Sequence, residues 1–269
     1  MKIIDSHIHF RVDPEGHFTE LAKQAGHENS EAHLRAVFRQ YNIERAVVMG
    51  NYGTDPEANH YPDIFYYAVG VNHMTAAELT DPRILGNIEE NLKRKTCVGV
   101  KLYPGYTHEY IYEKHYHGIY ELVARYGKAV AIHTGLTAND KGVLKYSHPL
   151  VVDETAAQFQ DTRFVMCHVG YPFLAEMEAV LEKNENVYGD LSGLIEGNFE
   201  IGEYVKTDYY FVEEVKKWLA ILNRYDKLMY GTDWPLTNMG AYIDFVKYIV
   251  PEKYWNAVFY ENAKRIYTM

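Results

Sequence analysis

Two histidines separated by one residue stand near the start of the sequence, His7 and His9 in the segment IDSHIHF. The segment is short and mostly apolar, which predicts a β-strand, and successive side chains of a strand point to opposite faces. His7 and His9 therefore share one face, while Ser6 and Ile8 take the other. Two imidazoles on one face can bind the same divalent ion. For any single histidine, a hydrogen-bonded core or surface position is the alternative.

Four other predicted strands end in groups that could join this pair. The strand KAVAIHT reaches His133, RFVMCHVG reaches His168, CVGVKLY places Lys101 on the same face as Gly99, and KLMYGTDWP reaches Asp233. A lysine directed into an apolar interior is costly unless it is paired or neutral, so a solvated charge explains Lys101 poorly. Imidazoles and carboxylates without thiolates form the ligand set of a catalytic zinc site, and manganese, iron or nickel accept the same ligands.

These groups need a scaffold that brings strand ends together, and the chain supplies eight short β-branched segments. Amphipathic helical patterns separate them, which predicts a parallel sheet closed into an α/β, (β/α)8 TIM-like barrel. The segments are residues 2–8, 45–50, 65–71, 97–103, 128–134, 163–170, 186–193 and 227–234. The alternative, an open doubly wound sheet, should carry a glycine-rich first turn, which SHIHFRVD lacks. We therefore expect the site at the carboxyl ends of barrel strands.

The barrel is expected to occupy residues 1–269 as a single domain, because no linker, repeat or low-complexity segment interrupts the pattern. Strict alternation in the fourth strand places Val98 toward the helices, opposite Lys101. The tail at about 240–269 predicts two closing helices after the eighth strand.

Composition limits the classes of function. A chain of 269 residues, 47% of them hydrophobic, can bury one large core, and the net charge of −10 without any Lys/Arg run argues against nucleic acid or an anionic membrane as partner. Cys97 and Cys167 show neither a CxxC spacing nor a disulfide framework. Since no leader or membrane-length apolar segment is apparent, we expect a cytoplasmic protein with a small-molecule substrate. Assembly into a homo-oligomer is left open.

The assembled motifs resemble the amidohydrolase superfamily, in particular its amidohydrolase-related (amidohydrolase 2) branch of metal-dependent hydrolases and decarboxylases. The resemblance runs through the whole chain and includes IDSHIH, VGVKLYPG, ELVARYGKAVAIHTG, HPLVVDETAAQFQDTRFVMCHVGYP, NVYGDLSG, YGTDWP and ENAKRIY. It implies one divalent ion, with zinc expected, and names as its ligands His7, His9, His133 and Asp233. It also implies that His168 is an acid/base or substrate-polarising group beside that ion.

The segment KLYPG also looks like a stretch of the dihydroorotases in which the matching lysine is carboxylated and bridges two metals. That likeness implies a binuclear site with Lys101 and His168 as further ligands. The branch that the whole chain resembles often keeps this lysine beside a single metal. We therefore expect one ion and keep two, with a carboxylated Lys101, as the alternative.

A metal site of this kind predicts an enzyme. Metal coordination lowers the pKa of bound water toward ~7, Asp233 can accept its proton, and His168 can hydrogen-bond a developing oxyanion. Hydrolysis of an amide, cyclic amide, lactone or ester of a small molecule fits these groups. The alternative is nonoxidative decarboxylation of a small carboxylic acid, although some decarboxylases of this branch carry glutamate at the position of His7. A scaffold or sensor would lack a catalytic group, whereas His168 and Asp233 are both present.

Three residues next to these strand ends are expected to contact substrate, namely Arg11, Tyr103 and Trp234. Arg11 is the cation close behind the histidine pair and can hold a carboxylate through two parallel hydrogen bonds, with a solvent-facing position as the alternative. The histidines of the loops, such as His17 and His73, are expected to be solvated. Substrate contact at the mouth of the barrel is their alternative.

Overall fold

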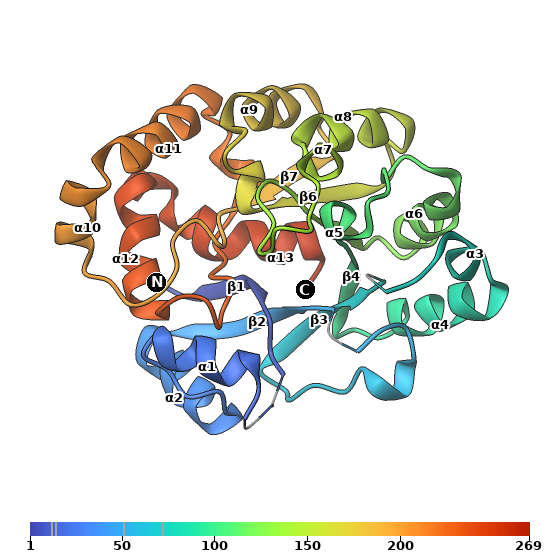
Figure 1. Ribbon diagram of the computed structural model, residues 1–269, viewed down its shortest axis with the longest axis horizontal. Coiled ribbons are helices and arrows are strands. Elements are labelled where there is room, and N and C mark those ends of the chain that lie inside the picture. Colours follow the sequence, from blue (N-terminus) through green and yellow to red (C-terminus); the bar gives the residue numbers. More distant parts are fainter. Residues whose placement is uncertain (12, 14, 51, 72) are drawn as a thin grey trace.

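Eight parallel strands lie side by side in chain order and form one sheet, which confirms the predicted (β/α)8 barrel (Figure 1). The computed structural model describes residues 1–11, 13, 15–50, 52–71 and 73–269. The strands are β1 (Ile3–Ile8), β2 (Ile43–Met49), β3 (Phe65–Gly70), β4 (Cys97–Leu102), β5 (Ala129–His133), β6 (Arg163–Cys167), β7 (Val187–Asp190) and β8 (Leu228–Met229). Each strand falls within or overlaps one predicted segment.

The seam between β8 and β1 closes the barrel. The Ser6 N–H donates to the Tyr230 carbonyl at 2.9 Å, and the Asp233 N–H donates to the His7 carbonyl at 2.9 Å. The regular part of β8 is nevertheless much shorter than the predicted 227–234, and the chain bends at Asp233, whose φ is 64°. The last strand therefore delivers Asp233 to the barrel end on a bent segment that still pairs with β1.

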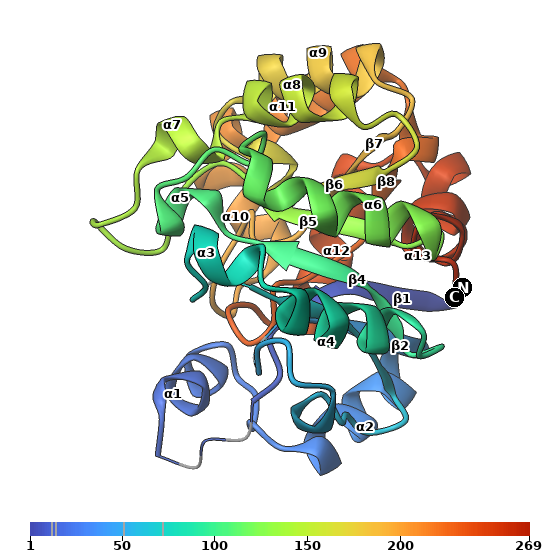
Figure 2. The same cartoon turned by 90° about the vertical axis from the view of Figure 1, so that its right-hand side faces the viewer.

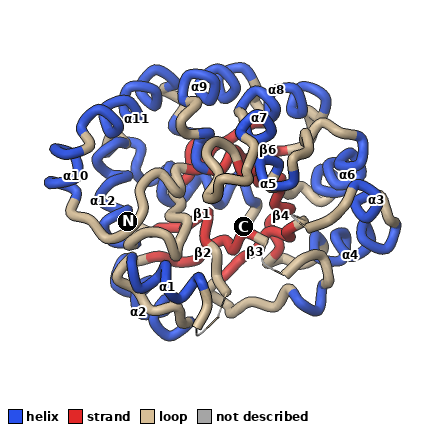
Figure 3. Tube along the Cα trace, in the orientation of Figure 1, coloured by secondary structure: helices blue, strands red, loops and turns tan. Residues whose placement is uncertain are grey.

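Helices surround the strands on all sides (Figures 1 and 3). They are α1 (His17–Gln24), α2 (Glu31–Tyr41), α3 (Ala76–Leu79), α4 (Pro82–Leu92), α5 (Pro104–Thr107), α6 (His117–Arg125), α7 (Leu144–Ser147), α8 (Pro149–Gln158), α9 (Leu174–Lys183), α10 (Ile201–Thr207), α11 (Tyr209–Leu222), α12 (Met239–Ile249) and α13 (Asn262–Tyr267). Within the described ranges, none of these helices combines the length and the apolar composition that crossing a membrane requires.

Local sequence signals explain where these helices begin and end. Asp81 caps α4 by accepting a hydrogen bond from the Arg83 N–H at 2.7 Å, and Pro82 occupies the first helical position, where no N–H is needed. Gly127 follows α6 with a φ of 61°, a conformation that glycine adopts without strain. Such caps set the chain direction into the next strand.

The C-terminal tail closes the end of the barrel that holds the amino ends of the strands. Both termini lie at this end, opposite α1, α5 and α7 (Figure 2). Apolar residues of the tail and of the strands pack together inside the barrel. The tail contributes Tyr260, Ala263, Ile266 and Tyr267, and the strands contribute Ile4, Val47, Ala68, Val98, Ala129, Ala131 and Val165. The predicted closing helices are thus present as α12 and α13. A π-helical turn, Ala257–Glu261, precedes α13.

The fourth strand departs from the predicted alternation at Gly99. Val98 packs with the apolar residues inside the barrel, which include those of the C-terminal tail, and not with the helices around the barrel. The register against β3 shifts between Tyr67 and Ala68, and Gly99 has a φ of 156°, so that the strand carries one extra residue. A Cβ on Gly99 would overlap the Ala129 carbonyl oxygen, which explains the glycine. Because of this bulge Val98 and Lys101 both face inward, and the expected position of Val98 was wrong.

A buried histidine outside the barrel predicts how stability depends on pH. His27 accepts a hydrogen bond from the Met239 N–H at 3.1 Å through Nε2, which places its proton on Nδ1, 2.8 Å from Nε2 of His33. Burial, followed by the neighbouring His33, lowers the pKa of His27 to about 4. The unfolded chain, with an ordinary histidine pKa near ~6.5, then binds more protons at acidic pH.

The free energy of unfolding is therefore expected to fall as the pH decreases from about 6.5 toward 4, and His27 contributes at most ~1.4 kcal/mol per pH unit to that slope. Urea unfolding of wild type and His27→Gln between pH 4.5 and 7 measures this share as the difference between two curves. His60→Gln provides the matched control, because it also removes a histidine but one that is exposed. Parallel curves for wild type and His27→Gln would show that His27 is not responsible.

Candidate metal centre and active site

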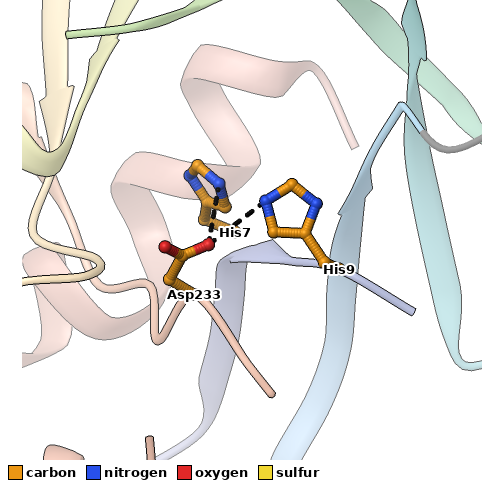
Figure 4. Close-up of side chains that lie close together, drawn as sticks. All are labelled: His7, His9 and Asp233. Atoms are coloured by element: carbon orange, nitrogen blue, oxygen red, sulfur yellow. Dashed lines mark ion pairs between the residues drawn. The ribbon is translucent and has the colours of Figure 1, made fainter. Parts of the chain in front are cut away.

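Three predicted ligands meet at the carboxyl ends of β1 and β8. Nε2 of His7 lies 3.3 Å from Oδ1 of Asp233, and Nε2 of His9 lies 3.2 Å from the same oxygen (Figure 4). Their ligand atoms all lie within 4.8 Å of one another. Strand alternation brings His7 and His9 to one side, and the bent segment after β8 supplies the carboxylate.

The orientation of His7 depends on a carboxylate that the sequence reasoning missed. Nδ1 of His7 lies 3.0 Å from Oδ2 of Asp190, at the end of β7, and both residues are fully buried. Burial lowers the pKa of His7 to about 4, so the ring is neutral. Burial alone would raise the pKa of Asp190, but the contact with His7 lowers it below its usual range. An ionised Asp190 can only accept, so it holds the proton of His7 on Nδ1.

The other ring nitrogen of His7, Nε2, faces a second atom that carries lone pairs, Oδ1 of Asp233. Nε2 of His7 carries a lone pair, and both this atom and Oδ1 of Asp233 are buried without a hydrogen-bond partner. Burial would raise the pKa of Asp233, but His7 and His168 lower it well below the usual range, so its carboxylate is charged. Two electron-rich atoms at 3.3 Å repel each other unless a cation lies between them. The residues present therefore fit a divalent metal ion.

His168 and His133 form a second pair beside this group. Nδ1 of His168 donates to the Ser192 carbonyl at 3.1 Å, and Nε2 of His133 donates to the Leu136 carbonyl at 2.8 Å. The other nitrogens, Nε2 of His168 and Nδ1 of His133, then face each other at 3.2 Å. Burial lowers the pKa of both rings, which are neutral and offer lone pairs. His133 thus contacts His168 and lies outside the compact group of His7, His9 and Asp233.

The backbone at these residues is unusual. His168 has a φ of 60° and Asp233 a φ of 64°, in the left-handed region that non-glycine residues rarely adopt. Gly193, with a φ of 63°, passes so close that a Cβ would lie 2.7 Å from Nδ1 of His168 and 2.9 Å from Oδ2 of Asp233. Positive φ values at residues that carry the chemistry are typical of functional sites.

Asp5 ties the two ligand-bearing segments together and was also missed. Its Oδ1 accepts from the Thr232 N–H at 2.9 Å and from the His7 N–H at 3.2 Å, and its Oδ2 accepts from the Thr232 hydroxyl at 2.6 Å. Burial raises the pKa of Asp5 to about 7. The carboxylate therefore positions the backbone immediately before Asp233 relative to β1. Asp5 stands two residues before His7, so strand alternation places both side chains on one face. This spacing is the signal that could have revealed Asp5.

Lys101 is fully buried, as predicted, but does not join the ligand group. Its Nζ donates to Sγ of Cys167 at 2.8 Å and lies 5.0 Å from the centre of the Tyr103 ring. Burial raises the pKa of the Cys167 thiol, so the lysine contacts a neutral thiol and an aromatic face. The amine that would have to be carboxylated in a binuclear site is thus engaged elsewhere.

We predict that Lys101→Met retains about one metal ion per chain, the same content as wild type, because the Lys101 amine donates to Cys167. Elemental analysis of both proteins, purified from cells grown with added zinc and bicarbonate, measures this. The matched control is Lys227→Met, which also removes a buried lysine, one that donates to the carbonyls of Leu181 and Asn184. About two ions in wild type and one in Lys101→Met would support the carboxylated, binuclear alternative.

A cavity of about 830 Å³ opens above these side chains. The described residues that line it are His9, His17, Phe18, Leu21, His73, Tyr103, Tyr106, His133, Leu136, Thr137, Ala138, His168, Tyr171, Gly193, Leu194, Glu196, Asp233, Pro235 and Leu236. Tyr103 therefore has the place expected of a substrate contact. His17 and His73, which the sequence placed in solvated loops, lie on the cavity wall.

Two other predicted substrate contacts lie elsewhere. Trp234 is fully buried in the apolar core, where its ring stacks on Phe10 with centroids 6.2 Å apart, and it is not among the lining residues that the structure describes. Asp233 and Trp234 are neighbours in sequence, but the bend at Asp233 sends their side chains in different directions. Arg11 is exposed and also lies outside the described lining, with its carbonyl accepting from the Asn29 amide at 2.8 Å.

Solved structures of the same fold are known. A probable 2-pyrone-4,6-dicarboxylic acid hydrolase from Acinetobacter baumannii aligns over 100% of both chains with a TM-score of 0.66 and 18% identity. A zinc-bound amidohydrolase from Burkholderia multivorans aligns over 100% of both chains with a TM-score of 0.71 and 13% identity. A 2,6-dihydroxybenzoate decarboxylase from Rhizobium aligns over 99% of this chain and 98% of its own, with a TM-score of 0.70 and 12% identity.

The sequence itself also carries a family assignment. No curated protein matches the chain significantly. The family model Amidohydro_2, described as amidohydrolase, matches residues 4–269, a range that includes every residue of the candidate site. The chain therefore belongs to the amidohydrolase family.

Proposed function

We propose that this protein is a metal-dependent hydrolase that cleaves an amide, cyclic amide, lactone or ester bond of a small molecule. The observation that supports it most strongly is the close approach of Nε2 of His7 and Oδ1 of Asp233, two buried atoms that have no hydrogen-bond partner. Asp233 lines the cavity. Together with His9 these residues would hold one divalent ion, with zinc as the proposed metal. A cavity of about 830 Å³ has room for a small-molecule substrate above them.

The bound ion would polarise a carbonyl group and make water acidic enough to react near neutral pH. Asp233, ionised under the influence of His7 and His168, can accept a proton from the attacking water and pass it to the leaving group. His168 is neutral and presents an unprotonated Nε2 toward His133. It can take up a proton and then hydrogen-bond the oxygen on which negative charge develops.

Nonoxidative decarboxylation of a small carboxylic acid is the second candidate. It is supported by the similarity of the fold to a 2,6-dihydroxybenzoate decarboxylase. An ion held by the same histidines and carboxylate would bind the acid group, while a protonated side chain would deliver to carbon the proton that replaces the departing carbon dioxide. Hydrolysis remains the first proposal, because Asp233 is charged, as a general base for water must be. Its carboxylate also lies beside the histidine pair that would hold the ion.

Turnover by metal-loaded protein tests the proposal. We expect about one ion per chain by elemental analysis after growth with zinc or manganese, and hydrolysis of at least one class among lactones, cyclic imides, N-acyl amino acids and esters. Removal of the ion with a chelator should abolish this activity, and re-addition should restore it. Carbon dioxide release from aromatic carboxylates, without hydrolysis of any ester or amide, would favour decarboxylation. Full activity of metal-free protein would contradict both candidates.

A further inference from the structure

The cavity wall contains carboxylates but no fixed cation. Among its described lining residues, Asp233 and Glu196 are acidic and none is a lysine or an arginine. Lys101 donates to Cys167, and neither Lys101 nor Arg11 is among the described lining residues. Outside the described ranges the residues are uncharged: Val12, Pro14, Asn51 and Asn72. A substrate with a carboxylate far from the metal would therefore meet negative charge without a compensating partner.

Glu196 stands on a loop whose backbone is held in place at both ends. At one end, Gly193 packs against His168 and Asp233. At the other, the Gly197 N–H donates to the Leu236 carbonyl at 2.7 Å, and the Gly197 carbonyl accepts from the Asn238 N–H at 2.9 Å.

The position of Gly193 beside His168 and Asp233 limits how far Glu196 can lie from these two residues. Three residues of extended chain span at most about 11 Å, so the Cα atom of Glu196 lies within that distance of the Cα atom of Gly193. Glu196 is an exposed residue of the cavity wall, so its carboxylate is accessible to the part of a substrate that lies away from the buried ligands His7 and Asp233.

The cavity wall suits a planar ring. The Tyr103 ring is stacked parallel to His133 with centroids 6.3 Å apart, and Tyr106 meets His133 edge-on at 4.9 Å. Phe18 and Leu21 of α1 also line the cavity. Aromatic and apolar walls favour the flat face of a ring.

We propose that Glu196 is a specificity-determining residue, which selects substrates that carry an ammonium or similar cationic group at the end remote from the reacting carbonyl. The inference rests on the proposed metal site and deepens the proposed hydrolase function. Glu196 attracts a cation across the cavity and repels a carboxylate at the same place, so the order of preference is cationic, neutral, anionic. Its side chain acts on binding of the distal substituent and takes no part in the chemical step.

Three ring compounds with the same metal-binding head group test the proposal by binding alone. They are benzohydroxamic acids that carry a 4-aminomethyl, a 4-methyl or a 4-carboxylate substituent. Isothermal titration of zinc-loaded wild type should give a dissociation constant at least about 5-fold lower for the cationic than for the anionic compound. Glu196→Gln should bring the three constants within about 2-fold of one another, and Glu196→Lys should reverse their order.

Two controls separate local from general effects. The neutral 4-methyl compound should bind wild type and Glu196→Gln equally, which shows that the metal site is intact in the variant. Glu203→Gln removes the same charge from an exposed position of α10 outside the described lining, and it should preserve the wild-type order. An order that Glu203→Gln also abolishes would overturn the inference, because the preference would then reflect net charge.

Equal binding of the three compounds to wild type, no change in Glu196→Gln, or no binding of any compound would each overturn the inference. The proposed hydrolase function fails separately. If the three hydroxamates are discriminated as expected and yet no ester, amide or lactone is hydrolysed, the charge selection by Glu196 stands and the assignment of hydrolysis falls.

Discussion

Asp233→Asn is expected to lower turnover by at least ~100-fold while much of the bound metal is retained. The substitution keeps the shape of the side chain and an oxygen that can face His7 and His9, which both lie within 3.3 Å of Oδ1. It removes the negative charge that allows the residue to accept a proton. Metal content by elemental analysis and turnover of the best substrate, measured on the same preparation, separate the two roles.

The control for this variant is an aspartate of the same chain that lies away from the cavity. Asp244→Asn on α12 removes an exposed carboxylate, 3.9 Å from Nζ of Lys247, and should leave both metal content and turnover unchanged. A near wild-type rate in Asp233→Asn would refute the assignment of this barrel end as the active site. Loss of all metal together with the rate would mean that the charge of Asp233 is needed for binding, and it would leave the proton-transfer role unsupported.

Asp190→Asn is expected to weaken metal binding by ~10–100-fold although residue 190 does not face the cavity. The Asp190 carboxylate accepts from Nδ1 of His7 through one oxygen and from the His168 and Ser192 N–H groups through the other. An asparagine can keep the second set of contacts only by turning its NH2 group toward His7. That NH2 would favour the tautomer with the proton on Nε2, which removes the lone pair that the ion requires.

Competition with a chelator of known affinity measures this change, and the free energy of unfolding of metal-free protein reports the accompanying structural cost. Ser192→Ala is the comparison variant, because it removes a hydroxyl that contacts the same carboxylate and Nδ1 of His7, at 3.1 Å, but leaves the bond from His7 to Asp190. It should weaken metal binding much less than Asp190→Asn. Equal affinities for wild type and Asp190→Asn would show that Asp190 does not set the tautomer of His7.

The barrel, and the gathering of the candidate site residues at one end of it, could be predicted from local patterns. The alternation of side chains in a strand has a period of two, so the spacing of His7 and His9 was enough to place both on one face. Parallel strands separated by helices all present their carboxyl ends to the same side, and this rule brings His133, His168 and Asp233 to the same rim without any knowledge of contacts. These properties are local in the chain, and the sequence determines them.

Contacts between distant segments could not be predicted in this way. Asp190 reaches His7 from 183 residues away, and Asp5 holds Thr232 from 227 residues away. A hydrogen bond between two strands depends on their register, which a pattern along one strand does not contain. Both aspartates were therefore overlooked, although each lies in or next to a motif that was recognised.

Only the tertiary structure decided which side chains line the cavity. The bulge at Gly99 turned Val98 inward, and the left-handed backbone at Asp233 directed Trp234 into the core. Glu196 came to the cavity through backbone hydrogen bonds between its loop and the segment after β8. A single residue outside regular geometry reverses the direction of the side chains that follow it, and its conformation is set by packing against neighbouring strands. The local sequence therefore determines which candidate ligands reach the barrel end, while packing between distant segments determines what surrounds them.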